Sequence, residues 1–347
     1  MKALVFYGVK DLRLENLPVP SVESREALIR VHAAAICATD LRVKTNGHRG
    51  IPQGGERILG HEVSGEIVEV GAGIKHLQPG QRVAVAPVAA CGYCRQCISG
   101  NATLCKFDKT LGLSVDGGFT EYMVVPESHV NGGNVFILPD SISYGLAAIA
   151  EPLATVFTGM QACNVKPGDI VLIVGAGPIG LMHILMAKIF GAQTVIVSEM
   201  LEERRKRARD FGADFIINPA AEDLRKSVMN LSYNRGADAI IIAAASSAAQ
   251  VGCIELAAIG GYINFFGTLP KGREKIVIDS NVIHYKNLKI TGTTGTTVLN
   301  YYKTMELLIS KRLDISGFIS AEFTLEQYEQ AFEFAGKNDS LKVLFRI

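Results

Sequence analysis

"DIVLIVGAGPIGLMHILMAKIFGA", residues 169–192, carries the strongest structural pattern in this chain. An unbroken apolar run leads into Gly175-x-Gly177-x-x-Gly180, and an apolar run of helical character follows. In a strand–turn–helix unit the first glycine permits the tight turn, the second lets a pyrophosphate approach the backbone, and the third lets the helix pack on the strand. The helix N-terminus then faces the phosphates. The stretch therefore predicts a dinucleotide-binding site formed by Gly175, Gly177, Pro178, Ile179 and Gly180.

The acid expected to bind the cofactor ribose closes the next apolar segment. Glu199 ends "TVIVSE" and lies nineteen residues after Gly180. A carboxylate at this place accepts hydrogen bonds from ribose hydroxyls and repels a 2′-phosphate, so we expect NAD rather than NADP. Arg204 is a further candidate cofactor-binding residue, and with Arg205 it weakens that preference. Most of the run "EERRKRARD" (202–210) has the composition of a solvated helix face.

Short apolar strands alternate with helical segments from about residue 150 onward. Strands that are apolar at every position are buried on both faces, which is typical of a parallel sheet covered by helices. We therefore expect an α/β, doubly wound parallel sheet here, with further cofactor contacts from Phe266, Gly267 and Thr268. The predicted strands after the glycine turn are "TVIVSE" (194–199), "DFIINP" (214–219), "DAIIIAA" (238–244) and "YINFFG" (262–267).

The first 150 residues have a different character and favour a β-rich domain. Short strand patterns such as "ALIRVHAAAI" (27–36), "VSGEIVEVG" (63–71) and "QRVAVAP" (81–87) alternate with glycine and proline turns. The "VGAG" at 70–73 leads into no helical segment, so it indicates a hairpin turn and not a second cofactor site. Two helical patterns and a final strand, "KVLFRI" (342–347), end the chain.

Composition excludes several classes of function. The chain has 347 residues, enough for two domains, and 35 Lys+Arg against 34 Asp+Glu give a formal charge of +1. This balance provides no polyanion-binding surface, so nucleic acid is not an expected partner. The uncharged stretch 170–187 has the length of a membrane span, but its glycine-proline turn would break a helix there, so we expect no membrane insertion. The opening "MKALVFYGVKDLRL" lacks the pattern of a secretory signal, which favours a cytoplasmic location.

Four of the seven cysteines lie within one short segment. Cys91, Cys94, Cys97 and Cys105 have the spacing Cys-x2-Cys-x2-Cys-x7-Cys. In a reducing compartment, clustered thiols are more typical of metal binding than of disulfides. Four thiolates around zinc form a closed site that stabilises a loop and leaves no position for a substrate. We therefore predict a structural zinc at this four-cysteine knot.

A second, scattered set offers ligands for a catalytic zinc. Cys37, His61, Glu62 and Glu151 provide one thiolate, one imidazole and two carboxylates, the ligand types of an open zinc site. None of them is diagnostic alone, because a single histidine is usually a buried polar residue and "EP" often begins a helix. Their spacing leaves both interpretations open.

Taken together, these motifs resemble the zinc-dependent medium-chain alcohol and polyol dehydrogenases, from one end of the chain to the other. The resemblance rests on Cys-x-Thr-Asp at 37–40, Gly-His-Glu at 60–62, the four-cysteine knot, Ala-Glu-Pro at 150–152 and Gly-Ala-Gly-Pro-Ile-Gly at 175–180. It implies a GroES-like catalytic domain (1–149 and 286–347) and a Rossmann NAD-binding domain (150–285). It also implies two zinc ions per chain, a cofactor and a catalytic zinc that meet in the interdomain cleft, and a homotetramer.

The resemblance assigns roles to individual residues. Cys37 and His61 match the zinc ligands common to the family, and Glu62 matches an acid that binds zinc directly or through water. Glu151 stands where the sorbitol and threonine dehydrogenase branch has a glutamate and simple alcohol dehydrogenases have a cysteine. Thr39 matches the hydroxyl that begins a proton relay. The implied reaction removes a hydroxyl proton through Thr39, with zinc lowering the pKa of that hydroxyl, and transfers a hydride to the nicotinamide.

Two positions depart from the family pattern. Relatives often continue the proton relay with a histidine five residues after the first zinc cysteine, whereas this chain has Arg42, which cannot act as a base near pH 7. Sorbitol dehydrogenases carry an Arg-Tyr pair that contacts substrate, whereas this chain has Gly295-Thr296 in that region. The first departure leaves the relay beyond Thr39 open, and the second weakens sorbitol as the specific substrate.

Three functions therefore remain open at the level of sequence. The leading hypothesis is NAD-dependent oxidation of a secondary hydroxyl of a polyol or sugar, and the second is oxidation of an amino alcohol such as L-threonine. A relative without catalytic zinc that only binds a nucleotide is the third, which the presence of all four candidate ligands disfavours. The loop "TNGHRGIPQGGERI" (45–58) supplies His48, Arg49 and Arg57, either as a solvated surface loop or as a contact for an anionic substrate.

Overall fold

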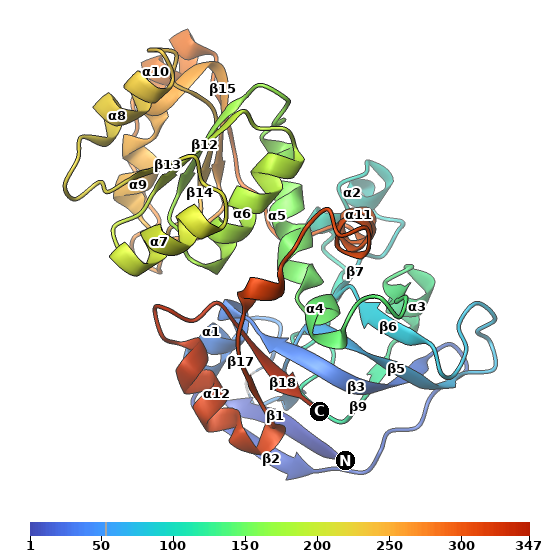
Figure 1. The fold of residues 1–347 in the computed structure, drawn as a ribbon. Coiled ribbons are helices and arrows are strands. Elements are labelled where there is room, and N and C mark those ends of the chain that lie inside the picture. Colours follow the sequence, from blue (N-terminus) through green and yellow to red (C-terminus); the bar gives the residue numbers. More distant parts are fainter. Residues whose placement is uncertain (53) are drawn as a thin grey trace. The chain divides into compact units, whose positions relative to one another are not determined.

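The structure is a computed structural model that describes residues 1–52 and 54–347. The chain forms two compact units. Unit 1 comprises Met1–Ala154 and Thr296–Ile347, and unit 2 comprises Thr155–Gly295. Both ends of the chain therefore belong to one unit, and in Figure 1 the red C-terminal strand β18 (Lys342–Arg346) lies beside the blue strand β3 (Ala27–Ile36) in one sheet.

Unit 1 is built around a seven-stranded, largely antiparallel sheet with the order β10-β6-β5-β3-β18-β17, in which β9 also pairs with β3. The long strand β3 (Ala27–Ile36) has the bounds predicted from its sequence and pairs with both β5 and β18. The other strands of this sheet are β5 (Glu62–Val70), β6 (Arg82–Val85), β9 (Tyr122–Val125), β10 (Val135–Ile137), β17 (Ile319–Phe323) and β18 (Lys342–Arg346).

Two smaller sheets and several short helices complete unit 1. The small sheets have the orders β2-β1-β4 and β7-β8. Their strands are β1 (Lys2–Gly8), β2 (Asp11–Asn16), β4 (Arg57–Ile58), β7 (Val88–Ala89) and β8 (Lys109–Thr110). The helices are α1 (Ala38–Asn46), α2 (Arg95–Ile98), α3 (Glu127–Asn131), α4 (Tyr144–Ala148), α11 (Val298–Ile309) and α12 (Tyr328–Ala335), with 3₁₀ turns at Ala102–Leu104, Ser316–Phe318 and Leu325–Gln327.

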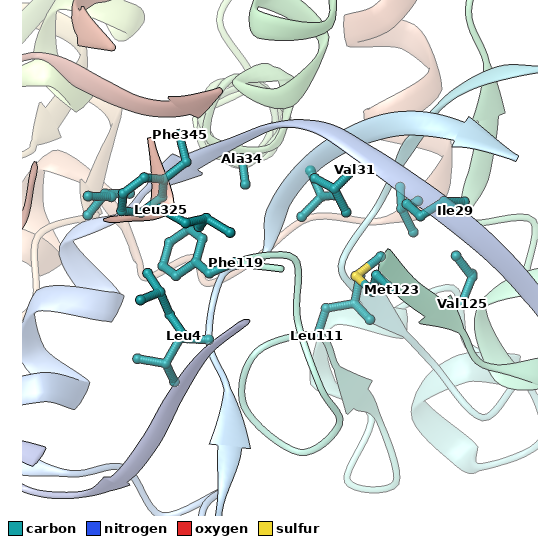
Figure 2. Close-up of a cluster of buried hydrophobic side chains, with 14 of the residues drawn as sticks. Leu4, Ile29, Val31, Ala34, Leu111, Phe119, Met123, Val125, Leu325 and Phe345 are labelled. Atoms are coloured by element: carbon teal, nitrogen blue, oxygen red, sulfur yellow. The ribbon is translucent and has the colours of Figure 1, made fainter. Parts of the chain in front are cut away.

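The core of unit 1 joins segments from the two ends of the chain. Phe119 packs edge-on against Phe345 of β18 and Phe332 of α12, with ring centroids 5.0 and 6.1 Å apart. Leu4 of β1 and Ile29 of β3 belong to the same buried cluster, and Figure 2 shows these side chains converging from several strands. This packing brings the C-terminal strand β18 beside β3, where it contributes to the candidate site.

Unit 2 is the parallel sheet that the glycine-turn sequence predicts, with the order β13-β12-β11-β14-β15-β16 and helices on both sides (Figure 1). All five residues of β11 are buried, as expected for a strand covered on both faces. The strands are β11 (Ile170–Val174), β12 (Thr194–Ser198), β13 (Phe215–Ile217), β14 (Ala237–Ile242), β15 (Ala257–Phe265) and β16 (Lys289–Thr291). The helices are α6 (Pro178–Ile189), α7 (Glu202–Asp210), α8 (Leu224–Leu231), α9 (Ser247–Gly252) and α10 (Ser280–Lys286), with a 3₁₀ turn at Ile254–Leu256.

The limits of the compact units differ from the domain limits expected from sequence. Helix α5 (Ala150–Ala162) begins in unit 1 and continues into unit 2. The sequence places the return to the first domain at residue 286, but β16 pairs in parallel with β15, so the second unit extends to Gly295. No helix in the described ranges has the length and apolarity needed to cross a membrane.

Candidate active site

The candidate ligands of the catalytic zinc lie at the ends of two neighbouring strands, β3 and β5. Cys37 follows β3 directly, and His61 and Glu62 stand at the start of β5. The two strands are antiparallel with Ala35 opposite Glu62, so the end of β3 lies beside the start of β5. One ligand atom from each of Cys37, His61 and Glu62 lies within 4.8 Å of the others. We call these three residues the mixed cluster.

Asp40 supports the mixed cluster from the first turn of α1. Its carboxylate Oδ2 accepts a hydrogen bond from the Cys37 backbone N–H at 2.9 Å, and its Oδ1 lies 3.6 Å from His61 Nδ1. Burial lowers the pKa of His61, but the charges of Asp40 and Cys37 outweigh it and raise that pKa well above its usual value. Since a metal requires the neutral imidazole, it would compete with a proton for this histidine.

Lys342 also contacts the mixed cluster, from strand β18. Its Nζ donates to Glu62 Oε1 at 2.6 Å and to the Ile36 carbonyl at 3.1 Å. Burial raises the pKa of Glu62, the neighbouring Glu151 adds to this shift, and the Lys342 charge opposes it. The pKa of the Tyr301 hydroxyl is raised by burial and also by the negative charges of Glu151 and Glu62.

The residues present fit a zinc ion. Buried polar atoms without a hydrogen-bond partner, among the residues described, include Glu62 Oε2, His61 Nδ1 and Asp40 Oδ1. A buried carboxylate oxygen without a partner is costly, and a cation would remove that cost. One thiolate, one imidazole and one carboxylate are a donor set that zinc accepts, with one position left open.

Glu151 and Thr39 lie close to the mixed cluster but outside it. Glu151 is half-buried in the first turn of α5, and its carboxylate is not among the atoms that converge within 4.8 Å. Its charge nevertheless affects Glu62, as the pKa shift shows. Thr39 lies on the first turn of α1, and its Oγ1 accepts a hydrogen bond from Arg42 Nη2 at 3.2 Å. Arg42, at the position where the family pattern expects a histidine, therefore contacts the Thr39 hydroxyl directly.

The four cysteines of the knot converge as their spacing predicts. The Sγ atoms of Cys94 and Cys97 are 3.4 Å apart, and Cys91–Cys97 and Cys94–Cys105 are each 3.9 Å apart. All four ligand atoms lie within 4.8 Å of one another, and none of these thiols is in a disulfide. Backbone N–H groups of Cys91 and Phe107 point at Cys105 Sγ, at 3.4 and 3.3 Å. Such donors stabilise a thiolate, so the arrangement fits a closed metal site.

The thiols of the knot differ in pKa. A hydrogen bond from the Cys97 backbone N–H, with further bonds from the neighbouring thiols, lowers the pKa of Cys94 to about 7. Cys94 stands just before the short helix α2, whose exposed N–H groups favour a negative charge. One thiolate is thus already favoured near neutral pH, which assists metal capture.

The glycine turn of unit 2 has the geometry that a dinucleotide requires. Gly175 has φ +95°, a conformation that only glycine adopts readily. A Cβ on Gly180 would lie 1.9 Å from the Gly175 carbonyl oxygen, whereas a Cβ on Gly177 would meet only Arg204 Nη1, at 3.8 Å. The second glycine therefore leaves the turn open, and Pro178 begins α6 behind it. Because β11 has β12 on one side and β14 on the other, the turn lies where the strand order reverses.

Glu199 is held rigidly beside this turn. Its Oε2 accepts from the Ala176 N–H at 2.7 Å and its Oε1 accepts from the Leu201 N–H at 2.9 Å. Arg205 instead donates to backbone carbonyls of Glu199 and Met200, so it closes the loop before α7. The structure thus places Glu199 and Arg204 at the glycine turn, as the sequence predicts.

The predicted contacts at the end of β15 lie beside the same turn. A Cβ on Gly267 would lie 2.8 Å from the carbonyl of Ala244, and Ala244 also borders Gly175. Phe266 packs edge-on against His183, with ring centroids 4.7 Å apart. Ile179 lies in the first turn of α6, and Thr268 follows Gly267 in the loop after β15.

The loop expected to offer cations is partly engaged within unit 1. Arg57 pairs with Asp116 at 2.8 Å, so its charge is already shared with a carboxylate of the same unit. His48 Nδ1 accepts from the Gly50 N–H at 3.0 Å, and Arg49 is exposed. Thr296, in the region where sorbitol dehydrogenases contact substrate, is buried and donates to the Ala154 carbonyl at 3.0 Å.

Two residues of this site were not predicted from sequence. Asp40 lies within the quoted Cys-x-Thr-Asp motif, but its support of Cys37 and His61 depends on the turn of α1. Lys342 is separated from Glu62 by 280 residues. Its one signal in the sequence is a lysine that opens the final strand, "KVLFR", directly before three apolar residues.

Comparisons with known families agree with this geometry. Residues 23–133 match the alcohol dehydrogenase GroES-like domain, and residues 178–311 match the zinc-binding dehydrogenase domain. The first match includes Cys37 and the knot, and the second includes α6 and most of unit 2.

Curated relatives cover nearly the whole chain. Sorbitol dehydrogenase of Bacillus subtilis (strain 168) is 34% identical over 99% of this chain and 96% of its own length. L-threonine 3-dehydrogenase of Pyrococcus horikoshii is 35% identical over 100% of this chain and 97% of its own length. A zinc-binding dehydrogenase of Sinorhizobium meliloti 1021, solved with NADP, has a TM-score of 0.91 and 29% identity, with 100% of this chain and 99% of that chain covered. The chain therefore belongs to the zinc-dependent medium-chain dehydrogenases, oxidoreductases that act with a nicotinamide cofactor.

Proposed function

We propose that this enzyme catalyses the zinc- and NAD-dependent oxidation of a secondary hydroxyl of a polyol or sugar, free, cyclic or phosphorylated, to the ketone. The observation that carries the proposal is the mixed cluster, in which Glu62 Oε2 is buried without a partner beside Cys37 and His61. A site with a carboxylate ligand is rich in oxygen and suits a chelating diol better than a lone alcohol. The relative named sorbitol dehydrogenase supports this substrate class.

In the proposed mechanism Cys37, His61 and Glu62 would hold the catalytic zinc. Glu151, on α5, is the further candidate ligand, and substrate would take the open position in its place. When bound, zinc supplies a Lewis acid that lowers the pKa of the substrate hydroxyl, and NAD supplies the hydride acceptor. Asp40 orients the backbone of Cys37 and the ring of His61. The knot, formed by Cys91, Cys94, Cys97 and Cys105, takes a second, structural zinc.

Thr39 is the proposed first proton acceptor, at Oγ1. The Arg42 guanidinium already donates to this oxygen, which fixes the position of the hydroxyl. Since a guanidinium stays protonated near pH 7, Arg42 cannot take the proton further. As Thr39 Oγ1 accepts the substrate proton, it must release its own hydroxyl proton to solvent, since Arg42 cannot take it.

The proposed cofactor is NAD, bound by the glycine turn with Glu199 toward the ribose hydroxyls. The relative solved with NADP shows that the fold also accepts the phosphorylated cofactor, so this preference requires its own test. Replacing Glu199 by alanine should lower kcat/KM for NAD and narrow its advantage over NADP by about tenfold, the size expected for one lost charged hydrogen bond. A wild-type enzyme with a higher kcat/KM for NADP than for NAD would contradict the assignment.

A substrate panel tests the proposed reaction directly. NADH absorbance would be followed with sorbitol, xylitol, inositol, galactitol 1-phosphate and L-threonine, with ethanol as the control. The proposal expects the highest kcat/KM for a polyol or sugar alcohol. If ethanol were the best substrate and every polyol were inert, the proposed reaction would be wrong.

L-threonine is the second candidate substrate, because a relative of nearly full coverage is an L-threonine 3-dehydrogenase. Activity confined to threonine in the same panel would establish this candidate in place of the first. The two are separable by product, since threonine yields an amino ketone and a polyol yields a ketose or cyclic ketone.

Metal content, assembly and location complete the proposal. Plasma emission analysis of the purified protein should give two zinc ions per chain, and full activity with zinc only at the knot would contradict the mechanism. We expect a homotetramer on the basis of the family resemblance, and a cytoplasmic location because the clustered thiols suit a reducing compartment. Light scattering at the monomer mass of 37.3 kDa would rule the tetramer out.

A further inference from the structure

Lys342 is a buried charge whose surroundings give it more than a packing role. It is the first residue of β18, and only 5% of its surface is exposed. Lysine is almost never fully buried unless it is paired, because removing an ammonium from water is costly. Here the ammonium donates to two acceptors, Glu62 Oε1 at 2.6 Å and the Ile36 carbonyl at 3.1 Å.

These two acceptors lie on the two segments that carry the mixed cluster. Ile36 immediately precedes Cys37, and Glu62 immediately follows His61. Strand β18 pairs with β3, which in turn pairs with β5, so Lys342 reaches from its own strand past the end of β3 to β5. A single ammonium therefore ties together the two strand ends that bring the ligand atoms within 4.8 Å.

Lys342 also distinguishes the two oxygens of Glu62. The Glu62 side chain is fully buried, and Oε1 is bonded to Lys342. Its Oε2 has no hydrogen-bond partner. Lys342 thus occupies Oε1, and Oε2 is left for a metal.

We propose that Lys342 is a positioning residue for the mixed cluster. It holds Glu62 Oε1 and the end of β3, so that Glu62 offers a metal only Oε2 and one place at the metal stays open for substrate. Its positive charge also offsets part of the negative charge of Glu62 and Cys37, which weakens the hold on a divalent cation. The inference rests on the proposed function only in taking the mixed cluster as a zinc site.

This role predicts opposite changes in zinc affinity and turnover when the charge is removed. In Lys342→Met both oxygens of Glu62 are free, and the cation that repels zinc is gone. Zinc should bind the mixed cluster at least about tenfold more tightly, since a unit charge within several ångströms changes a divalent ion's energy by more than 1.4 kcal/mol. The value of kcat should fall about tenfold or more, because the freed oxygen competes with substrate for the open place.

The measurement is competition for zinc with a chromogenic chelator, together with steady-state kinetics. Cys37→Ser lacks a ligand of the mixed cluster, so it measures the zinc that the knot alone binds. Lys342→Arg is the matched control, because it keeps the charge and the donors and should stay within a few-fold of wild type in both readouts. In a Glu62→Gln chain, Lys342→Met should change kcat much less, because the carboxylate that the lysine holds is absent.

A purely structural lysine would give a different result. Zinc affinity in Lys342→Met that is unchanged or weaker than in wild type would overturn the inference. If the metal-free variant is unstable, the rise in Tm on zinc addition is measured instead, because tighter binding gives a larger rise. A rise equal to or smaller than that of wild type would overturn the inference as well.

The outcomes separate this inference from the proposed function. If the wild-type chain bound zinc only at the knot, both the proposed function and this inference would be contradicted. Two zinc ions in wild type with an unaltered affinity in Lys342→Met would remove this inference alone.

Discussion

The glycine turn and the mixed cluster are assembled in different ways. In unit 2, the turn and its helix follow one another along the chain, so that Gly175, Gly177 and Gly180 share one strand–turn–helix unit. In unit 1, the mixed cluster takes Cys37 from the end of β3, His61 and Glu62 from the start of β5, and support from Lys342 in β18. The knot resembles the glycine turn, since its four cysteines lie within fifteen consecutive residues, 91–105. A contiguous site depends on local geometry, whereas an assembled site depends on the pairing of distant strands.

The largest expected effect comes from breaking the assembled site. Cys37→Ser should lower kcat/KM by about 10³-fold or more, because a Lewis acid contributes several kcal/mol to such a reaction. The fold should be retained, since Cys37 follows β3 without being part of its ladder. Steady-state kinetics and circular dichroism provide the measurement.

Cys253→Ser is the matched control, because Cys253 is a buried thiol of unit 2 that lies in neither metal-ligand group. It should keep the wild-type kcat/KM. An active Cys37→Ser enzyme with one zinc per chain would contradict the assignment of the mixed cluster.

Breaking the contiguous knot should affect stability and spare catalysis. Cys94→Ser removes a ligand from a closed site, and we expect a loss on the order of 3 kcal/mol, or a fall in Tm of roughly 5–10 °C. The kcat of the protein that remains folded should stay within about twofold of wild type, because the knot has no open position for substrate. A differential scan with and without chelator measures the shift. Loss of turnover at an unchanged Tm would reverse the roles assigned to the two sites.

A single methyl group should disrupt the contiguous glycine turn. In Gly180→Ala the new Cβ would lie 1.9 Å from the Gly175 carbonyl oxygen, so the turn must shift. We expect a loss of about 2 kcal/mol in stability and at least tenfold weaker cofactor binding by titration calorimetry. Gly252→Ala is the control, because nothing lies within 4 Å of a Cβ there. Unchanged cofactor affinity in Gly180→Ala would show that the turn is not the binding site.

The smallest expected effect concerns the response of unit 2 to pH. Burial lowers the pKa of His183 to about 3, and its Nε2 has no hydrogen-bond partner. Below about pH 6.5 the unfolded chain binds a proton here and the folded chain does not, so stability is lost as the pH falls from 6.5 toward 3. At pH 5.5 the loss from this residue is about 1.4 kcal/mol.

His183→Met should remove this part of the acid sensitivity. Urea unfolding at pH 7.5 and 5.5 should show about 1.4 kcal/mol less destabilisation in the variant than in wild type. His284→Gln, at an exposed histidine of the same unit, should leave the difference unchanged. An identical pH response in all three chains would indicate that His183 is protonated in the folded state.

The same contrast separates the features that the sequence predicts from those that it does not. The bounds of β3 and the order of strand, turn and helix in unit 2 are confirmed, because alternation and glycine spacing encode local geometry. No pattern in the sequence marks the short strand β16, "KIT", which is a strand through its pairing with β15. Arg57 was a candidate anion contact, but its pairing with Asp116, 59 residues away, could not be inferred from either residue alone.

By itself, the sequence determined the two contiguous sites and the fold class of unit 2. Cysteine spacing limits how four thiols can surround one ion, and glycines mark the backbone positions that a side chain would block. The tertiary structure decided the mixed cluster, because β3, β5 and β18 must pair before Cys37, His61 and Glu62 meet. It also decided which oxygen of Glu62 is free, since Lys342 lies 280 positions away and reaches that carboxylate only across the sheet. Short-range spacing is encoded in covalent geometry, whereas this arrangement exists only once burial of the core has set the order of the strands.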